Sequence, residues 1–453
     1  MTPQELKYSI ICLALQGKLA EQYVDDKPVD ISNIKQKQTE EYEFDLPEKW
    51  MIGHIETVTK IIPSRQYQIL ESEVLKEGKY AVISQSKEYS IGFSNDESKV
   101  FHHNEPVIVF GDHTTEIKYV NFDFVVGADG VKIFLPDSRI IFAKFFYYVM
   151  LFNSNGLNKV GGYSRHYKYI KDKAIPLPPL AEQKRIVAKI EELLPYIERY
   201  EKAWNKLEEL NKRFPTDLQK SILQLAIQGK LVEQRPEEGT AEELYQQIQA
   251  EKQRLIKEGK IKKEKPLPEI SVDEIPFDIP ESWKWVRVSS IVTLNPKNDI
   301  HDDTEVGFVP MPLVSDGFKN QHTFDIKKWK NIKSGFTHFA NNDIGIAKIT
   351  PCFQNRKSVI FKDLPNGFGA GTTELSIVRV INDSLCREYL LWFFKTDYFI
   401  TNGVKSFTGT AGQQRIHKDY LATCLIPLPP IAEQKRIVAK LEEILPLCEK
   451  LKK

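Results

Sequence analysis

Two polar loops carry the side chains that are best suited to chemistry in this sequence. They read GGYSRHYKY at residues 161–169 and TGTAGQQRIHK at residues 408–418. Each combines glycine with side chains that can bind nucleic acid, namely Arg165, His166 and Lys168 in the first loop and Gln413, Gln414 and Arg415 in the second. Glutamine and arginine can bind base edges with paired hydrogen bonds, and glycine lets the backbone approach a phosphate closely. DNA contact is one hypothesis for these loops, and a plain surface loop is the other.

Motifs for catalysis are absent from the sequence. There is no GxxxxGK[ST] phosphate loop, and NPKN at residues 295–298 does not match the Asn-Pro-Pro-aromatic tetrapeptide with which amino-methyltransferases hold a flipped base. GFGAG at residues 367–371 lacks the GxGxxG spacing, and we expect a tight turn there. A histidine-rich stretch near residues 102–113 shows no sign of convergent metal ligands. We therefore expect no active site, no cofactor and no metal in this chain.

Composition indicates a multidomain protein of the reducing cytoplasm. The chain has 453 residues, 41% of them apolar, and five cysteines without a CxxC pair. No segment approaches the roughly 20 apolar residues of a membrane span. Lys and Arg number 16 against 17 Asp and Glu in residues 43–174, and 18 against 15 in residues 276–425. Charge alone does not indicate nucleic acid, so bound DNA would need basic side chains gathered on one face or a partner's positive surface.

The elements that must position the two loops include a helix that occurs twice. Residues 175–202 read IPLPPLAEQKRIVAKIEELLPYIERYEK, and residues 426–453 read IPLPPIAEQKRIVAKLEEILPLCEKLKK, with 20 of 28 positions identical. A second echo pairs LKYSIICLALQGKLAEQ at residues 6–22 with LQKSILQLAIQGKLVEQ at residues 218–234, with 11 of 17 identical. Each predicts a helix, entered through prolines or closed by a glycine.

The order of these echoes predicts a circular arrangement. In the middle of the chain the IPLPP helix runs directly into the QGKL helix, whereas at the ends the same block is cut in two. The chain is therefore typical of a permuted tandem duplication, with a pseudo-two-fold axis and with Lys453 expected near Met1. The distal copy lacks a counterpart to most of residues 203–217, so the symmetry is imperfect.

Apolar residues in both long helices repeat as a heptad seam. The seam consists of Ile186, Ile190, Leu193, Ile197, Tyr200, Trp204 and Leu207 in one copy and of Ile437, Leu441, Ile444, Cys448 and Leu451 in the other. We expect the two seams to pack antiparallel on each other as a coiled coil. A helix from Ala181 to about Phe214 would be roughly 50 Å long. Pro195 and Pro446 interrupt the two copies equivalently, which predicts a kink or a break.

Between the helices lie two blocks that are expected to be α+β domains. Strand-like runs such as KYAVIS and EPVIVFG in the first and IGIAKIT and ELSIVRV in the second are followed by an aromatic helix and a glycine-rich loop. The charged segment before the second block is expected to be an exposed helix and linker. We predict an N-terminal helix and linker, a first domain, a central helical spacer with linker, a second domain and a distal helix, at residues 1–42, 43–174, 175–275, 276–425 and 426–453.

These motifs resemble those of one known family. IPLPP(L/I)AEQKRIVAK in two copies, each closing a variable block, and the QGKL(A/V)EQ echo resemble the DNA specificity subunit of type I restriction-modification systems over essentially the whole chain. KITPCFQNRK at residues 348–357, with GAGTTELSIVRV after it, looks like one version of a target-recognition domain. Residues 107–133, VIVFGDHTTEIKYVNFDFVVGADGVKI, look like another.

The resemblance implies a non-catalytic DNA-binding subunit. Each block would be a target-recognition domain that reads one half of a bipartite double-stranded DNA sequence, and the helices would set the half-site spacing. Two methyltransferase subunits would dock on the helices and carry S-adenosylmethionine, and they would flip the adenine to be methylated. Restriction and translocase subunits would add ATP-dependent cleavage.

The resemblance also carries DNA contact over to particular side chains in each domain. They are His113, Thr114, Thr115, Lys118, Arg165, His166 and Lys168 in the first domain, and Lys348, Thr350, Gln354, Arg356, Lys357, Thr372, Thr373, Gln413, Gln414 and Arg415 in the second.

Two other functions stay open at this point. The near-neutral charge of the two blocks suits a coiled-coil adaptor that assembles proteins without direct DNA readout. A self-contained modification enzyme is a third hypothesis, and the missing catalytic motifs argue against it.

Overall fold

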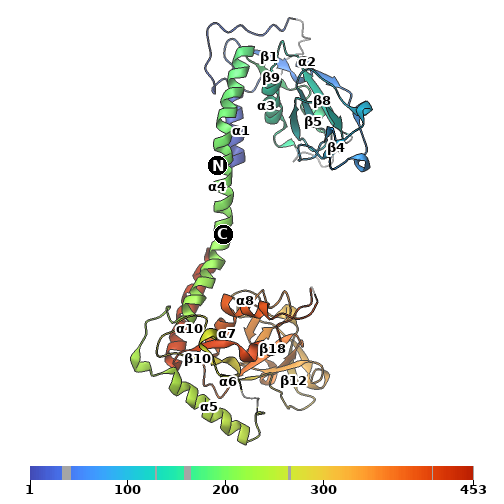
Figure 1. Cartoon of the computed structure of the whole chain (residues 1–453). Coiled ribbons are helices and arrows are strands. Elements are labelled where there is room, and N and C mark those ends of the chain that lie inside the picture. Colours follow the sequence, from blue (N-terminus) through green and yellow to red (C-terminus); the bar gives the residue numbers. More distant parts are fainter. Residues whose placement is uncertain (33–41, 128–129, 158–164, 264–266, 411, 452–453) are drawn as a thin grey trace. The chain divides into compact units, whose positions relative to one another are not determined.

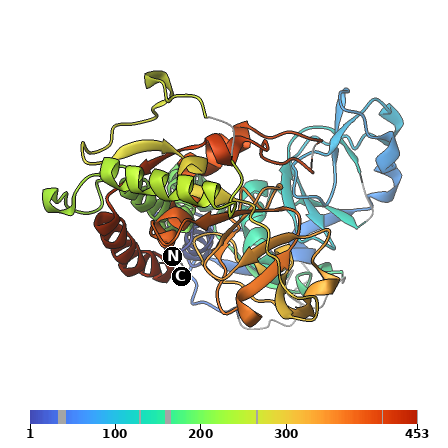
Figure 2. The same ribbon diagram turned by 90° about the horizontal axis from the view of Figure 1, so that it is seen from below.

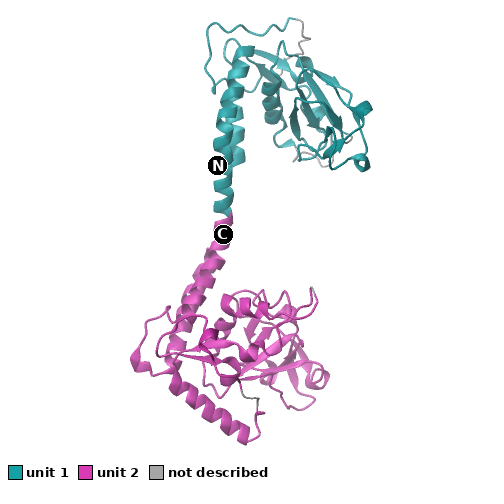
Figure 3. Ribbon diagram, viewed as in Figure 1, with its two compact units in different colours: residues 1–208 teal, residues 209–453 magenta. Residues whose placement is uncertain are grey.

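The computed structural model describes residues 1–32, 42–127, 130–157, 165–263, 267–410 and 412–451. It divides into two compact units, Met1–Glu208 and Glu209–Lys453 (Figure 3). The boundary falls inside helix α4 (Leu180–Ile227), so each half of α4 is described with its own unit (Figure 1). Helices and sheets occur in both units, which confirms the predicted α+β class.

Unit 1 contains the first α+β block and the helices beside it. Its elements are α1 (Pro3–Leu15), β1 (Met51–His54), α2 (Ile55–Val58), β2 (Thr59–Ile62), β3 (Tyr80–Ile83), β4 (Gly92–Ser94), β5 (Val107–Gly111), β6 (Ile117–Val120), β7 (Phe124–Val126), β8 (Val131–Pro136), α3 (Ala143–Ser154), β9 (Ala174–Leu177) and the first half of α4. One sheet is antiparallel throughout, in the order β2-β8-β5-β6, and a smaller sheet has the order β4-β3-β7 with β3 and β7 parallel.

Unit 2 repeats this plan with additions. Its elements are the second half of α4, α5 (Ala241–Lys257), β10 (Lys284–Arg287), α6 (Val288–Ile291), β11 (Val292–Leu294), β12 (Glu305–Val309), β13 (Asp325–Lys328), β14 (Thr337–Ala340), β15 (Ile344–Ala347), β16 (Ser358–Ile360), β17 (Phe368–Gly371), β18 (Leu375–Val380), α7 (Arg387–Phe394), α8 (Asp397–Lys405), α9 (Tyr420–Thr423), β19 (Leu425–Leu428) and α10 (Ile431–Lys450).

The sheets of unit 2 match those of unit 1 strand by strand. The antiparallel order β11-β18-β15-β16 corresponds to β2-β8-β5-β6. In the second sheet β12 pairs antiparallel with β13 and parallel with β17, as β3 pairs with β4 and β7, and β14 is an extra strand. The antiparallel pair β10–β19 corresponds to β1–β9. The two blocks therefore share one topology, although their sequences resemble each other only weakly.

The short helix α1 packs on the first half of α4. The Thr2 side chain accepts a hydrogen bond from the Glu5 N–H, the Glu5 carboxylate accepts one from the Thr2 N–H, and this capping box begins the helix. Ile11 and Leu15 share an apolar core with Ile186. The Tyr200 hydroxyl donates to the Met1 carbonyl at 2.8 Å, so α1 runs antiparallel to α4.

In unit 2 the second half of α4 packs in the same way on α10. Leu223 and Ala226 share a core with Ile437 and Leu441. Gln219 lies near the start of this half of α4, and its side chain donates to the carboxylate of Glu449, near the end of α10, at 2.8 Å. These helices are therefore also antiparallel.

The antiparallel helix packing that the sequence predicts is found within each unit, where the heptad seam packs on the helix of the QGKL echo. In unit 1 the turn after α1 is also fixed to the start of α4 through Arg185 and Asp26. Burial along the seams follows this pairing: Ile186, Ile190, Ile197, Ile437, Leu441 and Cys448 are buried, Leu193, Trp204 and Ile444 are half-buried, and Tyr200, Leu207 and Leu451 are exposed.

The long helices continue through their prolines. Helix α4 runs from Leu180 to Ile227, beyond the expected end near Phe214, with Pro195 inside it, and α10 contains Pro446. The expectation of a break is therefore wrong. A helical proline removes one backbone N–H donor, and both prolines lie on the exposed side of their helices, away from the seam that packs.

Two further expectations need correction. GFGAG is not a turn, because strand β17 covers Phe368–Gly371 and its glycines pack closely: a Cβ on Gly369 would lie 2.4 Å from the Phe339 ring. Helix α5, yellow-green in Figure 2, is not fully exposed, because Leu244 and Ile248 lie in the core of unit 2. Among the described residues no helix has the length and apolar character needed to cross a bilayer.

Each recognition block meets its long helix at a contact that we call the joint. In unit 1 the Trp50 indole N–H donates to the buried Glu182 carboxylate at 3.0 Å. The buried Gln183 amide oxygen accepts from the Phe142 N–H at 2.7 Å, and its nitrogen donates to the Pro178 carbonyl at 2.8 Å. Glu182 and Gln183 belong to the repeated AEQKR segment, and these contacts give a physical reason for their presence in both copies.

The joint of unit 2 has the same contacts. The Trp283 indole donates to Glu433 at 2.8 Å, and Gln434 accepts from the Cys386 N–H at 3.0 Å and donates to the Pro429 carbonyl at 2.9 Å. Burial raises the pKa of both the Glu182 and the Glu433 carboxyl groups. The joint therefore fixes each block on its helix by the same hydrogen bonds.

Candidate nucleic-acid interface

Three chain segments that are distant in sequence come together in unit 2. They are the β15–β16 connection, the β17–β18 connection and the loop before β19. The Lys348 N–H donates to the Glu374 carbonyl and the Ile416 N–H donates to the Lys348 carbonyl, at 2.9 and 3.0 Å. The Thr350 N–H donates to the Gln414 carbonyl at 2.9 Å. We call these connected segments the loop cluster of unit 2, and they hold most of the residues predicted to contact DNA in the second domain.

Arg415 is the most extensively bonded side chain among the predicted residues of this cluster. Its Nε and Nη2 donate to the two Glu374 carboxylate oxygens at 2.9 and 2.7 Å, and its Nη1 donates to the Gln413 carbonyl at 3.0 Å. The guanidinium holds the pKa of Glu374 below its usual value. Sequence reasoning missed Glu374, although it directly follows the predicted Thr372 and Thr373. These are half-buried and exposed, respectively, and the Thr372 hydroxyl accepts from the Glu374 N–H.

Other predicted residues of unit 2 differ in their availability. Gln413 and Gln354 are exposed, and the Thr350 hydroxyl donates to the Gln354 side chain. Lys348 and Gln414 are half-buried. Gln413 and Gln354 are therefore accessible to a ligand.

Arg356 and Lys357, by contrast, are engaged inside the domain. Arg356 pairs with Asp397 and donates to the Lys395 carbonyl at 3.0 Å. The Lys357 ammonium donates to the Met311 and Val314 carbonyls at 3.2 and 3.0 Å. These contacts favour a role in holding neighbouring loops, so DNA contact by these two side chains stays a prediction.

Unit 1 forms an equivalent loop cluster from the matching connections. The Asp112 N–H donates to the Gly130 carbonyl, and the His166 N–H donates to the Asp112 carbonyl, both at 2.7 Å. These two bonds correspond to those of Lys348 with Glu374 and of Ile416 with Lys348. By this match Arg165 corresponds to Arg415, and Gly130 stands where unit 2 has Glu374. The two predicted loops therefore occupy equivalent places.

Asp112, which sequence analysis did not select, holds the loop cluster of unit 1. Its carboxylate accepts from the Tyr167 N–H at 2.7 Å, and its carbonyl also lies 3.0 Å from the His166 Nδ1. His166 is 1% exposed, so it reaches a ligand only if the loop moves. Arg165 and Lys168 are exposed, and the Lys168 ammonium lies over the Tyr169 ring. Residues 161–164 lie outside the described residues.

Three further predicted residues of unit 1, His113, Thr114 and Thr115, lie in the turn between β5 and β6. The Thr114 hydroxyl donates to the Gln85 carbonyl at 2.6 Å, and the His113 N–H donates to the Gln85 side chain at 3.3 Å. Thr115 adopts a φ of 64°, and its hydroxyl donates to the Thr114 carbonyl. Gln85 was missed, although it follows the predicted strand KYAVIS directly.

Lys118, which lies in β6, differs from these turn residues. It is 5% exposed, and its ammonium donates to the Ser84 and Glu88 carbonyls. Burial lowers its pKa. This geometry favours a structural role that parallels that of Lys357.

Polar hollows lie beside each loop cluster, within each unit. In unit 1 a hollow of about 590 Å³ lies between the start of α1 and the β5–β6 turn, and Gln4, Tyr8 and Thr115 help to line it. In unit 2 a hollow of about 570 Å³ is lined by Thr216, Gln354 and Arg356 among others. Gln4 and Thr216 each lie two residues before the QGKL echo, so the hollows occupy similar places.

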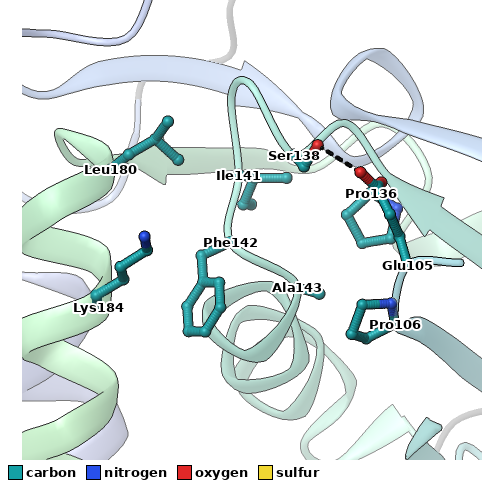
Figure 4. A pocket seen from close by; sticks show the side chains of 9 residues that line it. All are labelled: Glu105, Pro106, Pro136, Ser138, Ile141, Phe142, Ala143, Leu180 and Lys184. Atoms are coloured by element: carbon teal, nitrogen blue, oxygen red, sulfur yellow. Dashed lines mark hydrogen bonds between the residues drawn. The ribbon is translucent and has the colours of Figure 1, made fainter. Parts of the chain in front are cut away.

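A more apolar pocket lies away from the loop cluster of unit 1. Its volume is about 280 Å³, and Figure 4 shows it between the start of α4 and the turn before α3, with Leu180 and Phe142 facing it. The Ser138 hydroxyl donates to Glu105 at 2.9 Å on its rim. None of the predicted DNA-contacting residues lines this pocket.

Metal ligands do not converge in the part of the chain that the structure describes, where no three His, Cys, Asp or Glu side chains form a group. The histidines noted in the sequence have other contacts. His102 Nδ1 lies 2.7 Å from the Asp123 carboxylate, and His103 Nε2 lies 2.9 Å from the Phe122 carbonyl. The exposed side chains of the loop clusters, such as Arg165 and Gln413, offer hydrogen-bond donors to a polar ligand.

Comparison with known proteins identifies the family. Two parts of the chain, residues 47–210 and 280–453, match the model described as "Type I restriction modification DNA specificity domain". The Escherichia coli type I restriction enzyme EcoAI specificity subunit is 50% identical over 235 residues, which cover 52% of this chain and 40% of that protein. The EcoEI specificity subunit, also from Escherichia coli, is 48% identical over the same shares. The matches thus span less than half of either relative.

Solved structures are also among the matches. The HsdS subunit from Thermoanaerobacter tengcongensis is 19% identical, with 90% of this chain and 92% of that chain covered and a TM-score of 0.40. The family model covers most of the chain and includes both recognition blocks. The chain therefore belongs to the type I restriction-modification DNA specificity family.

Proposed function

We propose that the chain is the non-catalytic DNA-reading subunit of a type I restriction-modification complex. Each recognition block reads one half of a bipartite sequence through its loop cluster. The observation that carries this proposal is the equivalence of the two clusters: the same main-chain hydrogen bonds join the same three connections in each unit, with side chains of different chemistry on them. A constant scaffold with variable polar loops suits the reading of two unrelated half-sites.

The long helices would set the spacing of the half-sites and dock methyltransferase subunits. Lys184 and Ala188 in α4 match Lys435 and Ala439 in α10, and all four lie on the exposed side of their helices. The same exposed residues in both copies would let one kind of subunit bind twice. S-adenosylmethionine and ATP would then be bound by the methyltransferase and by the restriction and translocase subunits, in the cytoplasm.

A methylation assay with defined DNA tests this proposal. The chain is produced together with its methyltransferase subunit, and the methylated adenines are mapped by sequencing. We expect one split motif with a fixed gap, methylated on both strands, and binding that falls as salt rises. Equal binding of two unrelated duplexes at moderate salt, with the methyltransferase still bound, would favour the adaptor without direct DNA readout and would refute the proposal.

A further inference from the structure

The pairing of Arg415 with Glu374 leaves particular donors of the guanidinium unused. An arginine side chain carries five N–H groups. Glu374 accepts one from Nε and one from Nη2, and the Gln413 carbonyl accepts one from Nη1. One hydrogen therefore remains on each terminal nitrogen. The Arg415 side chain is 42% exposed, so solvent or a ligand can reach this end.

Other paired arginines of the second recognition block are less exposed than Arg415. The Arg379 guanidinium also binds a carboxylate through Nε and Nη2, but that carboxylate belongs to Asp343, which is 2% exposed, and Nη2 also donates to Asn298. Arg356 is 14% exposed. Arg415 thus combines a fixed guanidinium, an accessible end and a place in the loop cluster.

The pair has two properties that favour a base edge over a phosphate. Its charges cancel, so its attraction to the DNA backbone is weaker than that of a lone arginine. Its side chain is already ordered, so binding costs less conformational entropy. Two terminal donors of an arginine match the O6 and N7 acceptors of guanine, the commonest specific contact in the major groove.

We propose that Arg415 reads a guanine in the half-site of the second recognition block, and that Glu374 is a positioning residue for it. This inference rests on the proposed function. It names the base that is read, assigns it to the half-site of the second block, and adds Glu374, which sequence analysis did not select. This guanine can belong to either strand of the DNA, so the position appears in the mapped motif as a G·C pair.

The test maps the methylation motif of the complex with its methyltransferase subunit, for the wild type and for variants. With Arg415→Ala we expect one G·C position in one half of the motif to lose discrimination, on the order of 10- to 100-fold, with the other half unchanged. Arg415→Lys keeps the charge without the paired donors, so the same position should relax. Arg379→Lys alters a comparable pair outside the cluster, and Arg165→Ala alters the equivalent arginine of unit 1; neither should relax that position.

Glu374→Gln gives a readout that a purely structural role would not change. Removing the carboxylate leaves a net positive charge on Arg415, so we expect a steeper fall of affinity with salt as well as partial relaxation at the same G·C position. If Arg415→Ala fails to assemble, the lysine and glutamine variants decide the question.

Full discrimination retained in Arg415→Lys and Glu374→Gln, or relaxation at an A·T position, would overturn the inference while leaving the split motif of the wild type intact. A wild-type complex without any split motif would overturn the proposed function, and the inference with it.

Discussion

Arg165 in unit 1 and Arg415 in unit 2 occupy equivalent places, but their surroundings differ. Opposite Arg415 stands Glu374, whose carboxylate binds the guanidinium, whereas the equivalent position in unit 1 is Gly130. In unit 1 the cluster is held instead by the Asp112 carboxylate, which binds the main chain of the loop. The same backbone frame therefore supports two different sets of polar side chains.

The joints show the opposite pattern. The tryptophan, glutamate and glutamine of the joint are the same in both units and make equivalent hydrogen bonds. The attachment of each block to its helix is therefore the same in both copies of the duplication, whereas the side chains of the loop clusters differ. Changes in the joints should affect stability equally in both units, and changes in the clusters should affect one half-site only.

The largest expected effect comes from removing a tryptophan of the joint. Trp50→Ala should destabilise unit 1, and Trp283→Ala should destabilise unit 2, each by about 3–5 kcal/mol, because a buried ring is lost and a buried carboxylate loses its donor. Hydrogen exchange measured by mass spectrometry reports each unit separately. The phenylalanine variants keep an aromatic ring at the site and should cost less. A large effect in one unit and none in the other would contradict the equivalence of the joints.

A smaller effect is expected from the joint glutamine. Gln183→Ala leaves the Phe142 N–H without its acceptor, and Gln434→Ala does the same to the Cys386 N–H. Each should cost about 1–3 kcal/mol of unfolding free energy, measured by urea denaturation. Glutamate at these positions keeps the acceptor but loses the nitrogen that donates to the proline carbonyl, so it separates the two hydrogen bonds of each glutamine. Unchanged midpoints for both alanine variants would show that these hydrogen bonds do not hold the blocks.

The smallest effect concerns the ion pairs beside the joints and depends on pH. Hydrogen bonds from Arg185 and Arg436 lower the pKa of Asp26 and Glu238, respectively. A lowered pKa in the folded state stabilises the fold above the unfolded pKa of about 4, and this contribution is lost as pH falls through the folded value. Asp26→Asn and Glu238→Gln should cost at most about 1 kcal/mol at pH 7.

This pH dependence is tested by comparing the denaturation midpoints of the wild type and of each variant at pH 7 and below pH 4. The gap between the wild type and each variant should shrink at the lower pH. A gap that widens on acidification would show that other groups control the acid stability of the joints.

Much of the fold could be predicted from the repeats. AEQKR in two copies indicated two equivalent helix starts, and the runs EPVIVFG and ELSIVRV contain strands β5 and β18. The partner of each seam could not be predicted, because a heptad pattern gives the apolar face of a helix and not the helix that covers it. The domain boundaries stay a prediction.

The candidate site was predictable in part. The loops around Arg165 and Arg415 were selected because their residue types suit base contacts. The inward orientation of Lys118 and Lys357 could not be predicted, because basic side chains are expected on the surface and only the fold places free carbonyls beside them. Glu374 was missed for the related reason that an acidic residue is not expected to face DNA.

The contacts of Gln183 and Gln434 have a consequence for how such a chain can change over generations. Both amides bind main-chain N–H and carbonyl groups of the block and of the proline entry, and not side chains. Because these hydrogen bonds reach only the backbone of the block, the type of residue there matters little. Phe142 stands at this place in unit 1 and Cys386 in unit 2. A block with new loops, or a whole block from another gene, can therefore be accepted at either place without redesign of the helix that receives it.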